Sequence, residues 1–183
     1  TCLLLSLKMI GQVGATVVTS APTLEVGQKA LIAKEIDQLQ EAALQTTKLQ
    51  ESVSLMKETM KVVEQVNDKI TQSERVLNVL GKQVRLIKLI GETQNRLSRY
   101  KTLKSSDLSN IDARVGVLLK TGNELGLLLK NVLSSGYFKM NDSERFKMVE
   151  QVERDINRLY GSLRSLDTDY ERIHKNRLFY SKF

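Results

Sequence analysis

The feature that most constrains the fold is a regular spacing of apolar and small side chains through the first half of the chain. From Ile32 to Ile70 such residues recur every three or four positions, a mean of about 3.45, which is the spacing of a coiled-coil-like seam on a helix. At about 1.5 Å per residue, one helix from Thr23 to Ile70 would be roughly 70 Å long, so we predict an elongated molecule. The seam positions are Ile32, Ile36, Leu39, Ala43, Thr46, Leu49, Val53, Met56, Met60, Val63, Val66 and Ile70.

The seam becomes irregular around Asn67 to Ser73, and a capping-box pattern, Thr71-x-x-Glu74, follows it. The pattern leaves open whether this segment is a turn or a continuation of the helix. Beyond it, a second apolar helix face is predicted. This face comprises Val76, Leu77, Leu80, Val84, Ile87 and Leu97.

Two further helices are predicted in the second half. We expect a break at Ser105-Ser106-Asp107, a helix opened by Ser109-x-x-Asp112, and its end at Ser134 to Gly136. Asn141-x-x-Glu144 is the capping box of the last helix. With a single proline and few glycines in 183 residues, the chain is predicted to be all-α, an elongated antiparallel helical bundle with long coiled-coil-like helices over residues 23–183.

The first residues have a different character. Residues 1–15 form an apolar run followed by small residues, which is typical of a signal-peptide remnant cleaved after Ala15. Lys8 interrupts the run, and a short amphipathic helix is the alternative interpretation. Residues 16–22, ending at Pro22, are predicted to be an extended stub, because a residue before proline avoids the helical region.

The composition argues against an enzyme. The chain has one His and one Cys, and neither a phosphate-binding loop nor a nucleophile elbow appears. His174 lies in a basic tail without a positioned partner, and Asp167, Asp169 and Glu171 alternate in a way that does not place them on one helix face. We predict a non-enzymatic protein with no cofactor and no metal site.

Basic residues are concentrated between Leu80 and Lys104, where seven of them accompany only Glu92. A solvated helix face is one interpretation, and a surface for an acidic partner or an anionic membrane is another. Nucleic acid is less favoured, because only Tyr100 is available nearby to stack on bases. The basic residues are Lys82, Arg85, Lys88, Arg96, Arg99, Lys101 and Lys104, of which Lys82, Arg85, Lys88, Arg96 and Arg99 are candidate partner-binding residues.

The aromatic residues gather at the other end, with eight of nine in the last 47 residues. The apolar tail Leu178 to Phe183 either folds back on the bundle or docks on another subunit. Phe179, Tyr180 and Phe183 are therefore further candidate partner-binding residues.

Gly122 and Gly126 place two small residues one helical turn apart. In a membrane this spacing indicates helix pairing, and a membrane-active helix over Val115 to Leu133 is one interpretation. The charged residues within that run favour close packing inside a water-exposed bundle instead.

The order of these features resembles a known family. An export signal, Val17-Val18 followed by Pro22, a long Gln-rich helix and a last helix introduced by Asn-Asp-Ser-Glu-Arg-Phe (141–146) occur together in the minor-pilus, periplasmic component of bacterial conjugative (type IV secretion) systems, in particular conjugative-transposon transfer proteins. Ala21 replaces the acid of that family's Val-Val-x-Asp-Pro stub, with one extra residue before Pro22, and Phe146 replaces the Leu of its Glu-Arg-Leu.

The resemblance implies an exported helical protein that assists pilus assembly or mating contact without catalysis. It implies a periplasmic or cell-surface location after signal cleavage, and other secretion or pilus subunits as partners, with an anionic membrane surface or a second copy as further candidates. The alternative function is a cytoplasmic coiled-coil adaptor or a nucleic-acid-binding protein that uses the basic helix 82–104.

Overall fold

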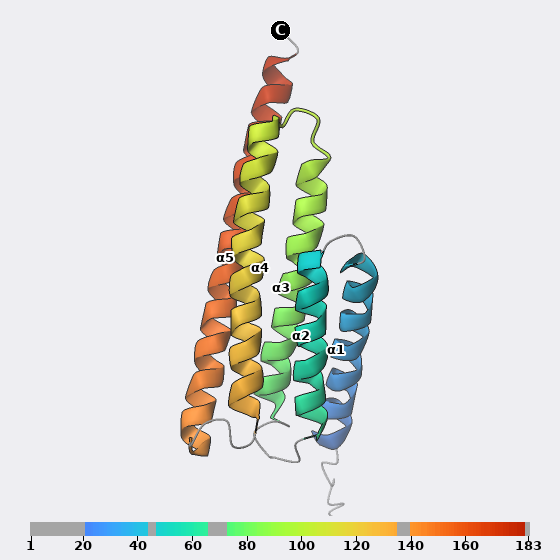
Figure 1. The fold of residues 1–183 in the computed structure, drawn as a ribbon, viewed down its shortest axis with the longest axis vertical. Helices are drawn as coiled ribbons and strands as arrows, with labels where there is room; N and C mark the ends of the chain where they lie inside the picture. The colour runs from blue at the N-terminus through green and yellow to red at the C-terminus, as the bar shows by residue number, and fades with distance from the viewer. Residues whose placement is uncertain (1–20, 44–46, 66–72, 135–139, 182–183) are drawn as a thin grey trace, which may run out of the picture.

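In the computed structural model, the described part of the chain forms five helices that alternate in direction along the long axis of the molecule (Figure 1). The structure describes residues 21–43, 47–65, 73–134 and 140–181, and these ranges contain no strand. The helices are α1 (Ala21–Ala43), α2 (Thr47–Gln65), α3 (Glu74–Ser98), α4 (Ser105–Leu133) and α5 (Asp142–Tyr180). The predicted all-α, elongated antiparallel bundle is confirmed.

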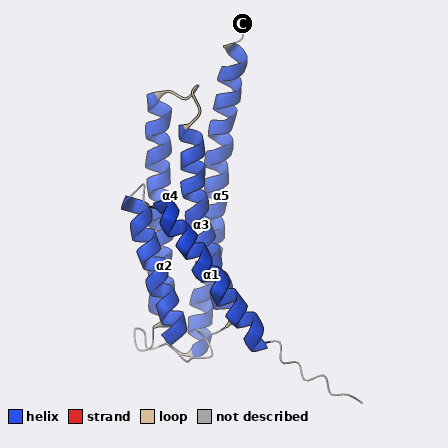
Figure 2. Ribbon diagram, turned by 90° about the vertical axis from the view of Figure 1, so that its right-hand side faces the viewer, coloured by secondary structure: helices blue, strands red, loops and turns tan. Residues whose placement is uncertain are grey.

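The helices α3 and α4 form the centre of the bundle. α5 packs along both of them, whereas the α1–α2 hairpin packs against them from another side (Figures 1 and 2). At about 1.5 Å per residue, the 39 residues of α5 extend about 58 Å, while the 19 residues of α2 extend only about 28 Å. The hairpin therefore covers only part of the length of α3 and α4, as Figure 1 shows.

The prediction of one continuous helix from Thr23 to Ile70 is wrong. The chain reverses between Ala43 and Thr47, and α1 and α2 lie antiparallel, with Lys57 Nζ 3.9 Å from a carboxylate oxygen of Asp37. A spacing of three and four residues identifies a buried helix face. The spacing is the same in one continuous helix and in two shorter helices that share a core, so it does not distinguish them. The seam residues that the structure describes are buried, namely Ile32, Ile36, Leu39, Leu49, Val53, Met56, Met60 and Val63.

Residues 66–72, for which a turn and a continuation of the helix were both left open, lie outside the described residues. α2 ends at Gln65 and α3 begins at Glu74, running in the opposite direction (Figure 1). The cap of α3 is Ser73, whose Oγ accepts a hydrogen bond from the Val76 amide at 3.3 Å. The predicted cap Thr71 lies outside the described residues.

The predicted start of the third helix is also wrong, because the observed N-cap is Lys104, five residues before the predicted Ser109. α4 begins at Ser105, because the Asp107 carboxylate accepts a hydrogen bond from the Lys104 amide at 2.7 Å and stabilises an earlier first turn. The segment that was predicted as a break is thus the start of the helix. α4 ends at Leu133 with Ser134 as its C-cap, where the predicted end begins, and Gly136 lies outside the described residues.

The capping box of the last helix is confirmed. The Asn141 side chain accepts from the Glu144 amide at 3.0 Å, and the Glu144 carboxylate accepts from the Asn141 amide at 2.9 Å. At the other end of the chain, the signal-like segment 1–15 and most of the stub lie outside the described residues. Ala21 and Pro22 are already helical instead of extended, since proline is tolerated in a first helical turn.

Gly122 and Gly126 allow close helix contact, as predicted for a bundle. A Cβ atom on Gly126 would lie 2.3 Å from Gln83 Nε2 of α3 and 2.9 Å from Met56 Cε of α2. Gln83 is fully buried and donates a hydrogen bond to the Gly122 carbonyl at 2.8 Å. Among the helices that the structure describes, none is long and apolar enough to cross a membrane.

Candidate interaction surfaces

Most of the basic residues of α3 are paired within the bundle. Lys82 Nζ lies 2.7 Å from one oxygen of Glu153 on α5, and an Arg75 nitrogen lies 3.1 Å from the other. The hydrogen bond from Lys82, with a smaller contribution from Arg75, lowers the pKa of the Glu153 carboxyl. Lys82 thus links α3 to α5 instead of pointing to a partner.

The next basic residues of α3 also have partners on neighbouring helices. Arg85 lies 3.5 Å from Glu35 of α1, beside a hollow of about 250 Å³ between α1 and α3. Arg96 forms an ion pair with Asp167 of α5 and bonds the Tyr100 hydroxyl at 3.0 Å. A weaker contact at 3.4 Å joins Lys88 to the Gln38 side chain of α1. The basic stripe predicted as one surface is therefore largely neutralised by α1 and α5.

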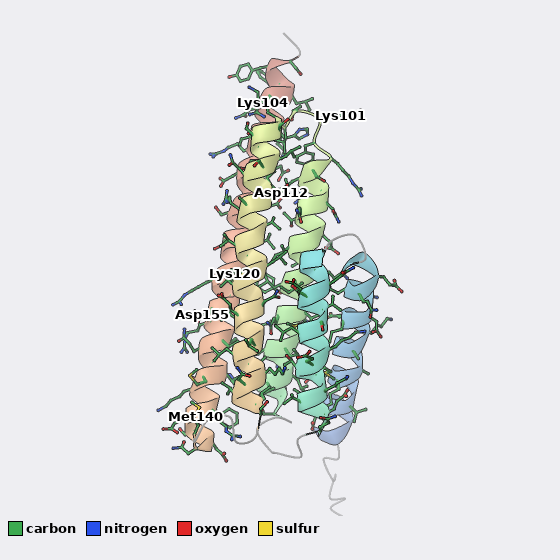
Figure 3. All side chains as sticks on the ribbon, in the orientation of Figure 1. Lys101, Lys104, Asp112, Lys120, Met140 and Asp155 are labelled. Carbon is green, nitrogen blue, oxygen red and sulfur yellow. The ribbon has the colours of Figure 1, made fainter. Side chains whose placement is uncertain are left out.

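Three basic residues remain exposed at the end of the bundle where α3 stops and α4 starts. Within the described part of the chain, the side chains of Arg99, Lys101 and Lys104 form no ion pair. Figure 3 shows Lys101 and Lys104 at the same end of the molecule as the C-terminal end of α5. Arg99 is the C-cap of α3, and its neighbour Tyr100 stacks on His174 of α5.

The apolar tail continues α5 and does not fold back over residues 178–181. Leu178, Phe179 and Tyr180 have exposed fractions of 45%, 59% and 75%. The Phe179 and Tyr180 rings meet edge to face, with centroids 5.6 Å apart. Phe183 lies outside the described residues. This end of α5 projects beyond the other helices (Figures 1 and 2).

The projecting end of α5 is held to the α3–α4 connection by several contacts. The His174 ring stacks on Tyr100 with centroids 4.0 Å apart, and His174 Nδ1 lies 2.7 Å from the Thr102 hydroxyl. Arg177 donates a hydrogen bond to the Thr102 carbonyl at 3.0 Å and forms an ion pair with Asp107. The hydrogen bond from Arg177 lowers the pKa of the Asp107 carboxyl. His174, for which the sequence indicated no positioned partner, is therefore part of this junction.

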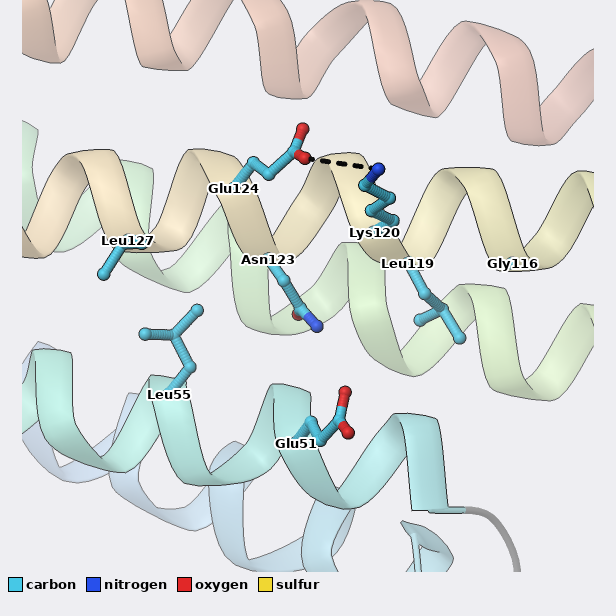
Figure 4. A pocket seen from close by; sticks show the side chains of 8 residues that line it. All are labelled: Glu51, Leu55, Gly116, Leu119, Lys120, Asn123, Glu124 and Leu127. Carbon is cyan, nitrogen blue, oxygen red and sulfur yellow. Dashed lines mark ion pairs between the residues drawn. The ribbon is translucent and has the colours of Figure 1, made fainter.

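A groove of about 440 Å³ lies between α2 and α4 (Figure 4). Leu55, Leu119 and Leu127 form its apolar lining, and the Asn123 side-chain oxygen is buried there without a hydrogen-bond partner. Charged residues surround it, with Lys120 Nζ 4.0 Å from Glu124. The residues around the groove are Glu51, Leu55, Gly116, Leu119, Lys120, Asn123, Glu124 and Leu127.

The sequence did not predict this groove. The available signal was that α4 carries more apolar residues than one packing face requires, such as Val117 and Leu127, which are 64% and 47% exposed. Because the same residue types fill the core, an excess on one helix does not say which neighbour leaves it uncovered.

The acidic residues near the end of α5 are engaged in ion pairs. Asp167 pairs with Arg96, Asp169 lies 3.4 Å from Arg114, and Glu171 lies 2.8 Å from Lys175. Over the ranges that the structure describes, no group of three or more His, Cys, Asp or Glu side chains is arranged to hold a metal ion.

Comparison with known proteins found no matching family model, no matching curated protein and no matching solved structure.

Proposed function

We propose that this chain is a non-enzymatic, exported structural or adaptor component of a bacterial conjugative DNA-transfer (type IV secretion) apparatus, which acts through protein–protein contacts. The observation that supports it best is the uncovered apolar groove between α2 and α4, on a bundle that pairs most of its α3 cations internally. The assignment to conjugation and to the periplasm or cell surface rests on the sequence resemblance.

The groove has the chemistry of a site for a helical segment of another subunit. Gly116, Lys120, Asn123 and Leu127 follow one another along α4 at spacings of three and four residues, which is the repeat that a neighbouring helix matches. Asn123 contributes an amide side chain to this lining, a group that both donates and accepts hydrogen bonds. An apolar lining that includes one amide side chain favours a specific contact between subunits.

Export is tested by fractionating cells that express the full-length protein and sequencing its mature N-terminus. We expect the protein outside the cytoplasm, beginning at Thr16. An uncleaved protein confined to the cytoplasm would contradict export. That result would not bear on whether the groove binds another subunit, which is tested separately.

The groove is tested in donor cells that lack the gene and are complemented with variants. Leu127→Arg places a charge on the apolar lining, and we expect DNA transfer to fall by about tenfold or more at unchanged protein level. The matched control is Val26→Arg, because Val26 is 67% exposed on α1 and lies outside the groove. A photo-crosslinker at residue 127 should form an adduct with an identified subunit of the apparatus. Transfer at the wild-type frequency by Leu127→Arg would refute the role of the groove.

The alternative function, nucleic-acid binding through the basic helix 82–104, has less support because its central cations already contact carboxylates or amides of α1 and α5. It requires binding to duplex DNA at low salt that weakens steeply as salt is added. It also requires that binding be lost when Arg85, Arg96 and Arg99 are changed to Glu. We expect no duplex binding at low salt.

A further inference from the structure

Beyond contacts with other subunits, we propose that the projecting end of the bundle binds an anionic lipid surface. The exposed apolar end of α5 enters the interfacial layer of the bilayer, and the basic residues of the α3–α4 connection contact the lipid phosphates. The proposal concerns the end of the molecule and is independent of the groove between α2 and α4.

The apolar part of this site is the last turn of α5. Leu178 and Phe179 are 45% and 59% exposed, and Tyr180 is 75% exposed. A tyrosine combines an apolar ring with a polar hydroxyl, and aromatic residues of this kind are enriched at the level of lipid headgroups. Three consecutive exposed residues of this chemistry at the tip of a charged helix are the composition of an interfacial anchor.

The basic part is a group of three cations in the connection between α3 and α4. The side chains of Arg99, Lys101 and Lys104 are exposed and form no ion pair with any described residue. The other cations of α3 contact α1 or α5, so these three carry charge that remains available to a partner. An anionic surface attracts such residues over about 10 Å at 0.1 M salt.

The contacts between α5 and the α3–α4 connection fix the two parts relative to each other. Arg177 bonds the Thr102 carbonyl at 3.0 Å, so this residue of α5 lies level with the connection that carries Lys101 and Lys104. Tyr180 follows three residues later, about 4.5 Å farther along the helix axis. Apolar groups of interfacial helices enter about 5–10 Å into the boundary between headgroups and acyl chains, and an offset of about 4.5 Å past the basic residues is of the same order.

The shape of the end favours a lipid surface over a folded protein. A stable protein interface buries about 800 Å² on each partner, in a surface of complementary shape. This site is instead the convex end of a single helix beside one chain connection (Figure 2). A bilayer adapts to a convex apolar end and supplies a continuous layer of phosphates, so it satisfies both parts of the site.

The test is flotation of the purified full-length chain with vesicles. One set contains phosphatidylcholine alone, and the other contains phosphatidylcholine mixed with phosphatidylglycerol. At about 0.1 M salt we expect binding to the anionic vesicles only, with a loss of about tenfold or more at about 1 M salt, where charges are screened within about 3 Å.

Two variants divide the site, and each has a matched control. Leu178→Ser with Tyr180→Ser removes apolar surface, and Val26→Ser with Leu31→Ser removes comparable exposed apolar surface on α1. The triple variant Arg99→Glu, Lys101→Glu and Lys104→Glu reverses the basic part. The same change at exposed Lys34, Lys147 and Arg164 is its control for net charge. We expect each site variant to lose about tenfold or more in affinity for anionic vesicles and each control to stay within about twofold.

Several outcomes would overturn the proposal. These are equal binding to the two kinds of vesicle, equal losses in the controls, or unchanged binding by either site variant. If the site variants bind vesicles normally but lose DNA transfer, the end docks on a protein and lipid binding is refuted. Circular dichroism melting verifies that every variant is folded. Leu127→Arg should bind vesicles like the wild type, which keeps this result separate from that of the groove.

Discussion

At the scale of single residues, the packing where α2, α3 and α4 meet requires that residue 126 be a glycine, which has no side chain. Gly126 leaves room for Gln83, which is fully buried and bonds the Gly122 carbonyl. The Gln83 side-chain oxygen has no hydrogen-bond partner, so this part of the core already contains one costly polar atom. A side chain added at residue 126 would therefore displace the Gln83 side chain from its hydrogen bond with the Gly122 carbonyl.

We expect Gly126→Ala to destabilise the fold by about 1–3 kcal/mol, because the new Cβ would lie 2.3 Å from Gln83 Nε2. The control is Gly161→Ala in α5, where a Cβ meets nothing within 4 Å. That change should stabilise the protein by about 0.5–1 kcal/mol, as alanine is the better helix former. Urea unfolding monitored by circular dichroism measures both. Equal effects of the two substitutions would show that residue 126 is not crowded.

Individual core positions could be predicted because burial follows helical spacing. Ile111, Val115 and Leu129 of α4, for example, are all at most 2% exposed. Gln83 could not be predicted, since a polar side chain inside an apolar pattern is indistinguishable from a surface residue until its neighbours are known. The contacts of His174 could not be predicted either, because its partners Tyr100 and Thr102 lie more than 70 positions earlier in the chain.

At the scale of elements, local signals predicted some helix boundaries and missed others, and they missed the reversal between the first two helices. The Asn141 capping box was predictable because both of its hydrogen bonds join residues three positions apart. The reversal between α1 and α2 was not, because no glycine or proline marks residues 44–46 and the apolar spacing continues through them. What distinguishes a hairpin from a rod is the position of the partner helix, which is not a local property.

The hairpin can be verified by a distance between labels on Asp37→Cys and Lys57→Cys, with Cys2 changed to Ser. In one continuous helix these positions would be about 30 Å apart. In the hairpin their side chains are in contact, so we expect strong dipolar coupling or efficient short-range crosslinking. The control pair is Ser143→Cys with Lys175→Cys on α5, which should give the long distance of an unbroken helix.

At the scale of the whole molecule, the net charge of +7 does not indicate which basic residues form ion pairs within the bundle. Much of the basic stripe that the sequence predicted as one binding surface turned out to be interhelix ion pairs. A charge count along the chain does not reveal that Glu35, Glu153 and Asp167 come to lie opposite that stripe. The candidate site that remains combines the end of α3 with the end of α5, two segments that only the fold brings together.

These ion pairs make stability depend on pH. The pKa values of Glu153 and Asp107 are lowered in the folded state by their basic partners, so the folded state binds those protons less tightly than the unfolded state does. The resulting stabilisation is present above the unfolded values, about 4, and is lost as the pH falls through the lowered folded values. We expect Glu153→Gln to reduce the loss of unfolding free energy on acidification, and Glu92→Gln, at an exposed residue without an ion pair, to leave it unchanged. An acid response of Glu153→Gln identical to that of the wild type would contradict this assignment.

The unequal lengths of the hairpin and the three longer helices have a dynamic consequence. The side chain of Leu49 on α2 lies against Gly91 of α3, and beyond that level α3 and α4 have, among the described helices, only each other and α5 as neighbours. Amide hydrogen exchange along α3 should therefore be graded, slowest between Val76 and Ile90 and faster over Gln94 to Ser98. The part of the bundle that includes the α1–α2 hairpin would then exchange slowly, while the end formed by α3, α4 and α5 opens by local fluctuation without global unfolding.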